Sequence, residues 1–512
     1  FLPSPPLTPL PPTFPPCHVG SVMSPQPLAL PERLMMMRFA LVLLAAVAVI
    51  LALCPAARAQ AAASPPQTPP REDADYTDGE LGERLAKAAR LAGGRGFSGA
   101  VLAAIDGKVV AAVGVGHADL AGEVPNTPAT LFEIASLTKQ FTGAAAARLA
   151  ADGKLSLDDP ISRFLPMAGV TESAHAITLD HLLRHTSGIP GTNSSGRGDD
   201  IGAVLPLFLR GGPRRTPGEH WEYWNQGYAI ASEIIARAAG VPYTDYCKQH
   251  LFIPAGMRAT CFTGDPAPEG MTVAIGRSAR GEPRSALEHP YGGYGFQYRG
   301  MGGVVTNVWD LWRWDRALHA DVPLNSDAKA KLFEPGPGDY GLGWFIRRDD
   351  HGRLVHSHGG GVRGFICEMR RYPEQDAVLI VLANRDDAPL RRVVTDLEKI
   401  LFGEATAQHA AALGVIPDEL QAVLTGRYED DRGRRLIIEA DGRTTAARIS
   451  WSVNGGPPVT HATLHLDAER RIIFDDGADL IPITIEPADA AAARTPVEAV
   501  VILNLRFQRV QP

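Results

Sequence analysis

The sequence predicts an α/β protein of the α+β kind: an antiparallel sheet flanked by helices, followed by a small all-β C-terminal domain. Two β-rich runs, residues 98–104 and 109–115, flank Asp106-Gly107, a dipeptide suited to a tight hairpin turn. Helical and strand signals then mix irregularly up to Phe402, unlike the regular alternation of a doubly wound sheet. After Leu413, short β-prone segments separated by turn residues are typical of a small barrel or sandwich.

We divide the chain into five parts from its changes in composition. Residues 1–34 are Pro-rich, and we expect translation to begin after them, within Met35-Met36-Met37. Residues 60–80 are rich in Pro and Ala and lack apolar periodicity, which indicates a linker. The parts are the upstream segment 1–34, a signal peptide 35–59, the linker 60–80, a main folded domain 81–405 and an all-β domain 413–512.

Residues 39–54 form an apolar run that follows Arg38 and precedes Ala57-Arg58-Ala59. A basic residue, an apolar stretch and a small-residue site are the three parts of a secretory signal, so we expect cleavage after Ala59. The mature protein is then periplasmic or secreted, without a stable membrane span. Two alternatives remain at this stage: an uncleaved membrane anchor, and a lipid anchor at Cys54, whose preceding residues resemble a lipobox.

Charge and cysteine content exclude several classes of function. The formal net charge is -7 and no Lys/Arg cluster is present, so nucleic acid is not expected as a partner. Two of the five cysteines lie before residue 60, and the three that follow cannot all pair within one chain, so no disulfide framework is implied. We expect no cofactor, because Gly114 and Gly116 lack the third glycine of a dinucleotide loop.

The first chemical signal is Ser136, three residues before Lys139 and at the start of a helix-forming stretch, residues 140–151. We expect Lys139 to lie beside the serine hydroxyl on one helix face, where the helix dipole favours developing negative charge. A lysine in a desolvated pocket loses its charge and serves as the base that a serine nucleophile needs. By itself the spacing is weak evidence, since roughly one such match occurs by chance in a chain of this size.

The second signal is an aromatic turn, Trp221-Glu222-Tyr223-Trp224-Asn225. Tyr223 and Asn225 stand at i and i+2 just before a helical run, so they are placed to present a phenol and an amide to one pocket. The phenol would relay protons with the lysine. The alternative interpretation is a structural plug, since aromatic-rich turns often fill cores.

The third signal is an extended segment, residues 355–365, that passes through His356, His358 and three consecutive glycines. Such glycines let a backbone approach a substrate closely and direct N–H groups at an oxyanion. The two histidines share one strand face and invite comparison with a zinc site. We expect no metal, because no carboxylate follows and no second His or Cys cluster completes the ligand set.

Taken together with the text around them, these signals resemble the serine β-lactamase and penicillin-binding-protein superfamily, in the branch of AmpC-type β-lactamases, D,D-carboxypeptidases, D-aminopeptidases and related esterases. The similarity covers about residues 97–402 in the family's order. The similar segments are residues 132–139 (FEIASLTK), 155–160 (LSLDDP), 177–190 (ITLDHLLRHTSGIP), 217–218 (PG), 254–257 (PAGM), 302–306 (GGVVT) and 340–344 (YGLGW). The resemblance implies a β-lactamase/transpeptidase-like fold for the main domain.

The resemblance also implies roles for the site residues. Ser136 would be acylated, Lys139 would activate it, and Tyr223 would assist proton transfer to the leaving group. Asn225 would hold the substrate amide, and the backbone N–H groups of Ser136 and Gly361 would form the oxyanion hole. The remaining positions that we assign to substrate binding are His358 and Gly360, in the third motif.

Two departures from the family pattern bear on the substrate. Trp224 stands where Ser is usual between the Tyr and the Asn, which we expect to reshape the pocket wall. His358-Gly359-Gly360 replaces Lys-Thr-Gly and resembles the His-x-Gly of peptidase and esterase members. A lysine there anchors the β-lactam carboxylate, whereas a histidine with a pKa near 6.5 is mostly neutral at pH 7. Efficient β-lactamase activity is therefore not expected.

The sequence thus predicts an exported serine hydrolase that cleaves an ester or amide, either a short ester or a D-amino-acid peptide, through an acyl-enzyme on Ser136. The expected partner is a small-molecule or peptide substrate, with cell-wall peptide among the candidates. Two alternatives stay open: a β-lactamase proper, and a non-catalytic penicillin-binding receptor or scaffold.

Overall fold

A computed structural model describes residues 71–191, 198–278, 281–293, 295–404, 414–431, 435–440, 445–450, 459–466, 472–475, 480–486, 497–502 and 505–510. The upstream segment, the apolar run of the expected signal peptide and most of the expected linker lie outside these residues. Among the described residues, no helix is long and apolar enough to cross a membrane.

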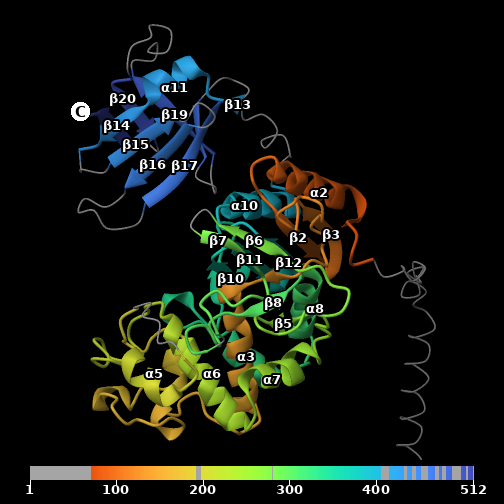
Figure 1. Cartoon of the computed structure of the whole chain (residues 1–512), viewed down its shortest axis with the longest axis vertical. Helices are drawn as coiled ribbons and strands as arrows, with labels where there is room; N and C mark the ends of the chain where they lie inside the picture. Colours follow the sequence, from red (N-terminus) through yellow and green to blue (C-terminus); the bar gives the residue numbers. More distant parts are fainter. Residues whose placement is uncertain are drawn as a thin grey trace, which may run out of the picture. The chain divides into compact units, whose positions relative to one another are not determined.

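The main domain is built on a seven-stranded sheet in which all neighbouring strands are antiparallel, as the sequence predicts (Figure 1). The β2–β3 hairpin turns at Asp106 and Gly107, whose φ angles of 51° and 69° are those of the tight turn expected there. In order across the sheet the strands are β1 (Tyr76–Thr77), β3 (Lys108–Val115), β2 (Gly99–Ile105), β12 (Ala377–Ala383), β11 (Phe365–Tyr372), β10 (Leu354–Val362) and β9 (Phe345–Arg348).

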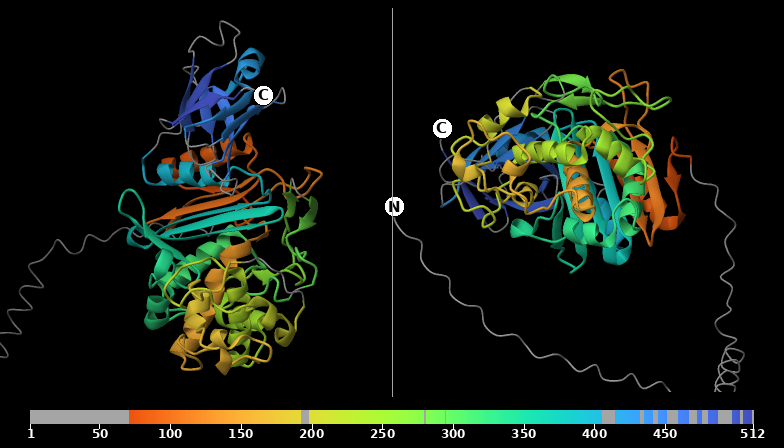
Figure 2. Two further views of the ribbon diagram at one scale, coloured as in Figure 1. Left: turned by 90° about the vertical axis from the view of Figure 1, so that its left-hand side faces the viewer. Right: turned by 90° about the horizontal axis from the view of Figure 1, so that it is seen from below.

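Each face of the sheet is covered by helices, which gives the domain three layers (Figure 2). Helices α2 (Gly79–Gly93) and α10 (Leu390–Leu401) pack on one face and bury one apolar cluster with β2, β3 and β12. The opposite face packs against α3 (Lys139–Ala151), α8 (Val308–His319) and a larger helical region, forming the main core.

Helix α3 is buried on all sides over most of its length, whereas the sequence pattern indicated a single apolar stripe. Its alanines allow neighbouring helices to approach closely. The surrounding elements are η2 (Ala135–Thr138), η3 (Ile161–Arg163), η4 (Glu172–Ala174), α4 (Leu179–Leu183), α5 (Ile201–Phe208), α6 (Asn225–Ala239), α7 (Tyr243–Cys247), η5 (Lys248–Phe252), α9 (Ser326–Leu332), η6 (Pro337–Asp339) and η7 (Pro373–Gln375).

Two small sheets complete the main domain beside the nucleophile segment. One joins β4 (Phe132–Glu133), β8 (Val304–Thr306) and β5 (Cys261–Phe262), and it carries the chain directly into the turn that holds Ser136. The other is a hairpin of β6 (Ile275–Ser278) and β7 (Gly281–Ser285). The first of these sheets therefore connects the nucleophile segment to β8 and β5.

In the part that the structure describes, the C-terminal domain is all-β apart from one short helix, α11 (Asp418–Leu424), which the sequence pattern did not predict. Successive strands pair antiparallel, and β14 pairs with β21, so the strand order closes on itself as a barrel with an apolar interior. Its strands are β13 (Gly414–Val415), β14 (Gly426–Glu429), β15 (Arg435–Ala440), β16 (Thr445–Ser450), β17 (Val459–Leu466), β18 (Ile472–Asp475), β19 (Leu480–Glu486), β20 (Ala499–Ile502) and β21 (Leu505–Arg509).

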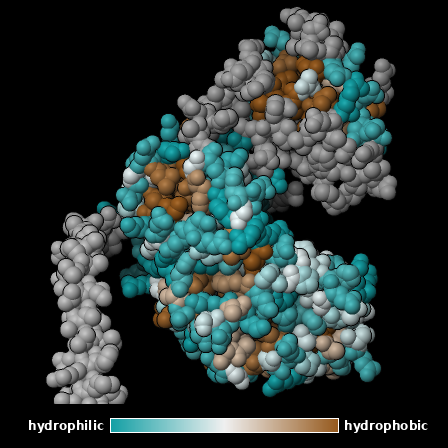
Figure 3. All heavy atoms as spheres, turned by 180° about the vertical axis from the view of Figure 1, so that it is seen from behind, coloured by the Kyte–Doolittle hydropathy of each residue, from teal (hydrophilic) through white to brown (hydrophobic). Residues whose placement is uncertain are grey.

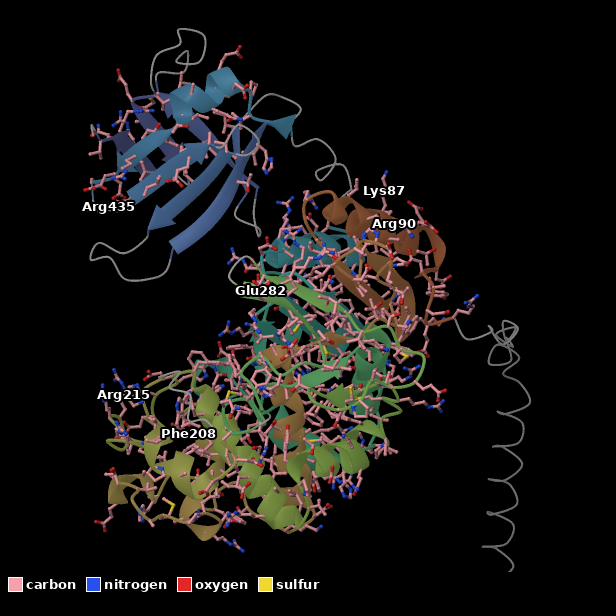
Figure 4. The ribbon with its side chains drawn as sticks, viewed as in Figure 1. Lys87, Arg90, Phe208, Arg215, Glu282 and Arg435 are labelled. Carbon is pink, nitrogen blue, oxygen red and sulfur yellow. The ribbon has the colours of Figure 1, made fainter. Side chains whose placement is uncertain are left out.

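The described surface is mixed in polarity. On the face drawn in Figure 3, hydrophobic residues form separate patches divided by hydrophilic ones. Charged side chains of α2 such as Lys87 and Arg90 point outward (Figure 4), and Arg90 pairs with Asp75 at 2.8 Å. Such scattered exposure is ordinary for a folded domain and marks no docking face.

Candidate active site

Ser136 lies in the short 3₁₀ turn η2 that runs directly into helix α3. The residue before it, Ala135, has a φ of 43°, a left-handed conformation that alanine rarely adopts. Such backbone strain persists only where the surroundings over-determine the conformation. Ser136 itself is half-buried, so its hydroxyl is held at the helix start with one side open.

Lys139 is fully buried, and its Nζ donates hydrogen bonds to Ser136 Oγ at 2.9 Å and to the carbonyl of Met301 at 3.0 Å. Desolvation lowers the pKa of this amine well below its usual 10.5. A neutral amine has a free lone pair and accepts the serine proton. The residues that the sequence paired therefore stand in the geometry of a nucleophile and its base.

Tyr223 brings a phenol to the same hydroxyl. Its side chain hydrogen-bonds Ser136, and burial raises the pKa of the phenol to about 12, so it is protonated at neutral pH. The Lys139 Nζ lies 5.0 Å from the centre of the Tyr223 ring. The three groups thus gather around the Ser136 hydroxyl.

Trp224 and Asn225 follow at the start of α6. Trp224 is 2% exposed and packs into the core against Gly227, so it does not form the pocket wall that we expected it to reshape. Asn225, the first residue of α6, is half-buried. The aromatic turn therefore has both of the roles considered for it: Trp224 fills the core, and Tyr223 reaches the nucleophile.

His185 supports Tyr223 from behind and was missed as a site residue, although it lies within the family-like segment 177–190. Its ring lies 4.3 Å from the Tyr223 ring, and its Nδ1 accepts a hydrogen bond from the Trp224 N–H at 3.1 Å. It is buried, with a φ of 59°. Burial lowers the pKa of the imidazole well below 6.5, so a neutral ring packs there. The only sequence signal is its place in the segment HTSG.

Strand β10 presents the glycines. The edge strand β9 pairs with β10 only as far as Ser357, which leaves residues 358–362 as a free edge. A Cβ at Gly360 would lie 2.3 Å from the Ile134 carbonyl oxygen and 3.1 Å from the Ser136 nitrogen. Only glycine allows the strand to pack so closely on the nucleophile turn. Gly361 is exposed, and a Cβ there would meet nothing nearer than 3.7 Å.

His358 is turned into the protein. Its Nε2 hydrogen-bonds the Tyr340 hydroxyl at 2.9 Å, its Nδ1 contacts the Gly359 carbonyl at 2.5 Å, and it is 3% exposed. Burial, aided by Lys139, lowers the pKa of the imidazole to about 3. The ring is therefore neutral at pH 7, and both nitrogens have partners within the protein. In this geometry His358 holds Tyr340 and offers no cation to a substrate.

His356, the other histidine of β10, lies apart from His358. His356 stacks on the Phe333 ring at 4.3 Å, away from the nucleophile. Within the described ranges, no group of three or more His, Cys, Asp or Glu side chains is arranged to hold a metal ion. The strand therefore offers backbone groups and a packed imidazole to the site.

A cavity of about 340 Å³ lies where Gly359 and Gly360 of β10 meet Glu368 of β11 and residues 388–391 at the start of α10. A larger cavity of about 680 Å³ lies elsewhere, along the end of α3 and beside Arg184 and Glu334. The smaller cavity lies on the side of the sheet that α10 covers, whereas the nucleophile turn packs on the opposite side with α3, so neither cavity is assigned to the substrate.

The fold and the grouping of Ser136, Lys139 and Tyr223 are those expected of a serine-hydrolase family, and comparison with known proteins gives the family. The beta-lactamase family model matches residues 85–401. The chain is 31% identical over 336 residues to penicillin-binding protein 4* of Bacillus subtilis, which covers 60% of this chain and 73% of that protein. It is 29% identical over 316 residues to protein flp of Staphylococcus aureus, covering 58% and 61% of the two chains.

Solved structures share the fold. The octameric penicillin-binding protein homologue from Pyrococcus abyssi superposes with a TM-score of 0.56 at 22% identity, covering 84% of this chain and 99% of that one. The D-amino acid amidase from Ochrobactrum anthropi gives a TM-score of 0.53 at 24% identity, covering 63% and 98%. This chain belongs to the beta-lactamase family of serine hydrolases, as the sequence resemblance implied.

Proposed function

We propose that this protein hydrolyses an ester or amide in two steps through a covalent acyl-enzyme on Ser136. Neutral Lys139 takes the serine proton as Oγ attacks the carbonyl carbon. Tyr223 then passes a proton to the leaving group as the tetrahedral intermediate collapses, and water releases the acid. The backbone N–H groups of Ser136 and Gly361 are the proposed oxyanion donors, with Asn225 on the substrate amide.

One observation carries this proposal: a fully buried lysine whose Nζ donates to Ser136 Oγ at 2.9 Å, with the Tyr223 phenol on the same oxygen. Burying an amine away from a carboxylate partner is costly unless it is neutral. The fold holds the lysine, the serine and the phenol together beside the glycine-rich strand β10. A structural role alone does not require this combination.

The proposed substrate is a short ester or a D-amino-acid peptide rather than a β-lactam. A penam or cephem carries a carboxylate that a cation at the third motif would bind. Here that position holds His358, neutral and hydrogen-bonded within the protein. Turnover of nitrocefin, short p-nitrophenyl esters and D-Ala-D-Ala peptides separates the three classes. We expect ester or D-peptide turnover to exceed nitrocefin turnover, and the reverse order would favour a β-lactamase.

The covalent step is tested with a fluorescent fluorophosphonate. The chain contains a matched control, because Ser326 and Lys329 have the same spacing at the start of α9, on the surface. Wild type and Ser326→Ala should label equally, and Ser136→Ala should not label. Equal labelling of all three proteins would refute the assignment of Ser136 as the nucleophile. Acylation without turnover of any substrate in the panel would instead support a penicillin-binding receptor.

Export is proposed on the sequence alone, from the apolar run 39–54 and the Ala57-Arg58-Ala59 site. Expression of the chain from Met35 in a bacterial host, followed by fractionation and N-terminal sequencing, tests it. We expect the mature protein outside the cytoplasm and beginning at Gln60. A membrane fraction that retains residues 39–54, or a lipid-modified Cys54, would establish one of the two anchored alternatives.

A further inference from the structure

A buried ion pair lies beside the nucleophile segment and takes no part in the chemistry described above. The Arg284 side chain, on β7, is 1% exposed and donates to the fully buried carboxylate of Glu133. The hydroxyl of Tyr298 donates to the second oxygen of the same carboxylate. Figure 4 labels Glu282, two residues before Arg284, and shows the hairpin that carries both.

The same guanidinium binds three backbone carbonyls. Its Nε donates to Arg363 at 3.0 Å, and its Nη1 donates to Glu288 at 2.9 Å and to Ser285 at 3.3 Å. The Phe365 ring lies 5.0 Å from the guanidinium carbon. Arg284 therefore connects β4, the turn between β10 and β11, and the loop that follows β7.

Three segments of this hydrogen-bonded network, those that hold Glu133, Tyr298 and Arg363, each lead within three residues to a part of the candidate site. Glu133 precedes Ser136 by three residues, with the strained Ala135 between them. Tyr298 precedes Met301 by three, and the Met301 carbonyl accepts the Lys139 hydrogen bond.

The third connection is to the glycine strand. Arg363 follows β10 directly, two residues after Gly361. The nucleophile segment and the glycine strand thus meet through Arg284, and the segment that binds the base joins them through the Glu133 carboxylate.

We propose that Arg284, with Glu133 and Tyr298, is a positioning group that fixes the spacing between Ser136, Lys139 and the edge of β10. The inference rests on the proposed hydrolase function. None of the three side chains touches the reacting atoms in this arrangement. Their effect is preorganisation, in which a displacement of about 1 Å at the nucleophile lowers the rate by roughly 10²-fold.

The competing explanation is that the pair only stabilises the fold, and the chain offers a control for it. Asp315 and Arg371 form a second buried pair, on α8 and β11, at 2.5 Å and with exposures of 0% and 3%. Breaking either pair is expected to destabilise the protein, because it leaves an uncompensated buried charge. Only the Arg284 pair is expected to alter acylation.

The experiment measures the melting temperature, kcat, KM and the second-order rate of fluorophosphonate acylation for Arg284→Lys, Glu133→Gln and the control Arg371→Lys. We expect acylation and kcat of the first two to fall about 30-fold, with KM within about threefold of wild type, since the loss concerns nucleophile geometry. Arg371→Lys should lose a similar melting temperature and keep its acylation rate within about threefold.

A double variant, Glu133→Leu with Arg284→Met, separates stability from positioning. Apolar replacement of a buried pair often restores stability, so we expect its melting temperature to recover while acylation stays slow. Provided that wild type acylates, two results would overturn the inference. One is recovery of both the melting temperature and the acylation rate in the double variant; the other is an acylation rate that falls with melting temperature equally at both ion pairs. If Arg284→Lys does not fold, Tyr298→Phe gives the same test, with an expected loss of about threefold to tenfold. A wild type that does not acylate at Ser136 would overturn the proposed function as well.

Discussion

Two places in the molecule carry the same four-residue spacing, Ser136 with Lys139 and Ser326 with Lys329, and each opens a helix. At the second, Ser326 is exposed, and Lys329 Nζ donates to the Ala320 carbonyl at 2.7 Å and pairs with Asp321 at 2.8 Å. At the first, Lys139 is fully buried and directed at its serine. Burial and convergence with Tyr223, rather than spacing, therefore distinguish Lys139, the proposed base, from Lys329.

The largest expected effect separates the two serines. Ser136→Ala removes the nucleophile, so kcat with the best substrate of the panel should fall at least about 10³-fold. Ser326→Ala removes an exposed hydroxyl at a helix start and should stay within about twofold of wild type. Steady-state kinetics on both variants measures this difference, with melting temperatures as the check on folding. A comparable loss of activity in Ser326→Ala would contradict the distinction between the two serines.

The two lysines give the next effect. Arginine keeps its charge in proteins and does not act as a base at neutral pH. Lys139→Arg should therefore lower kcat on the order of 10²- to 10⁴-fold, whereas Lys329→Arg keeps both its ion pair and the activity. Near-wild-type turnover by Lys139→Arg would show that Lys139 has an electrostatic role and that another group takes the serine proton.

The adjacent glycines of β10 extend the comparison to close packing. Gly360→Ala places a methyl against the Ile134 carbonyl and the Ser136 nitrogen, at 2.3 and 3.1 Å, so the nucleophile turn or the strand must move. We expect about a 10²-fold loss of acylation rate. Gly361→Ala meets nothing nearer than 3.7 Å and should lose less than about tenfold. Equal losses would place the constraint in substrate contact instead of packing.

The smallest expected effect is on the pH profile between pH 5 and 8. The base must be neutral, so kcat/KM falls as pH decreases through the pKa of Lys139, which burial lowers from 10.5. His358, with its pKa lowered to about 3, should add no inflection near 6.5. His358→Gln should leave the inflection points in place. An inflection near 6.5 that disappears in this variant would assign the titration to His358.

The β2–β3 hairpin and the pairing of Ser136 with Lys139 followed from the sequence because local turn chemistry and short spacing specify them, whereas the convergence of Tyr223, 87 residues further along, was implied by the family resemblance. The all-β character of the C-terminal domain followed from its regularly spaced turns, although closure through β14 and β21 joins residues about 80 apart and leaves no local pattern. The sequence left open whether the aromatic turn fills the core or forms the pocket, and it did not assign the core role to Trp224. That role depends on packing against α6, and the sequence showed only an aromatic residue in a polar position.

Residues that act through long-range contacts were also beyond the sequence. Arg284 and Glu133 are 151 positions apart, and a charged residue in sequence is expected to be exposed. His358 was expected to face the substrate because its motif faces outward in the family. The partner that turns it inward is Tyr340, 18 residues away in a different element. Tertiary packing decides such side-chain orientations, and the periodicity of a sequence gives no information about that packing.

The central claim, that burial makes Ser136 the nucleophile while an identical spacing at Ser326 stays inert, is tested most directly by locating a covalent adduct. Wild-type protein is treated with an alkyl fluorophosphonate and digested, and the peptides are sequenced by mass spectrometry. We expect one adduct per chain, on the peptide that contains Ser136, and none on the peptide that contains Ser326. An adduct on Ser326 or on another residue, with Ser136 unmodified, would contradict the account.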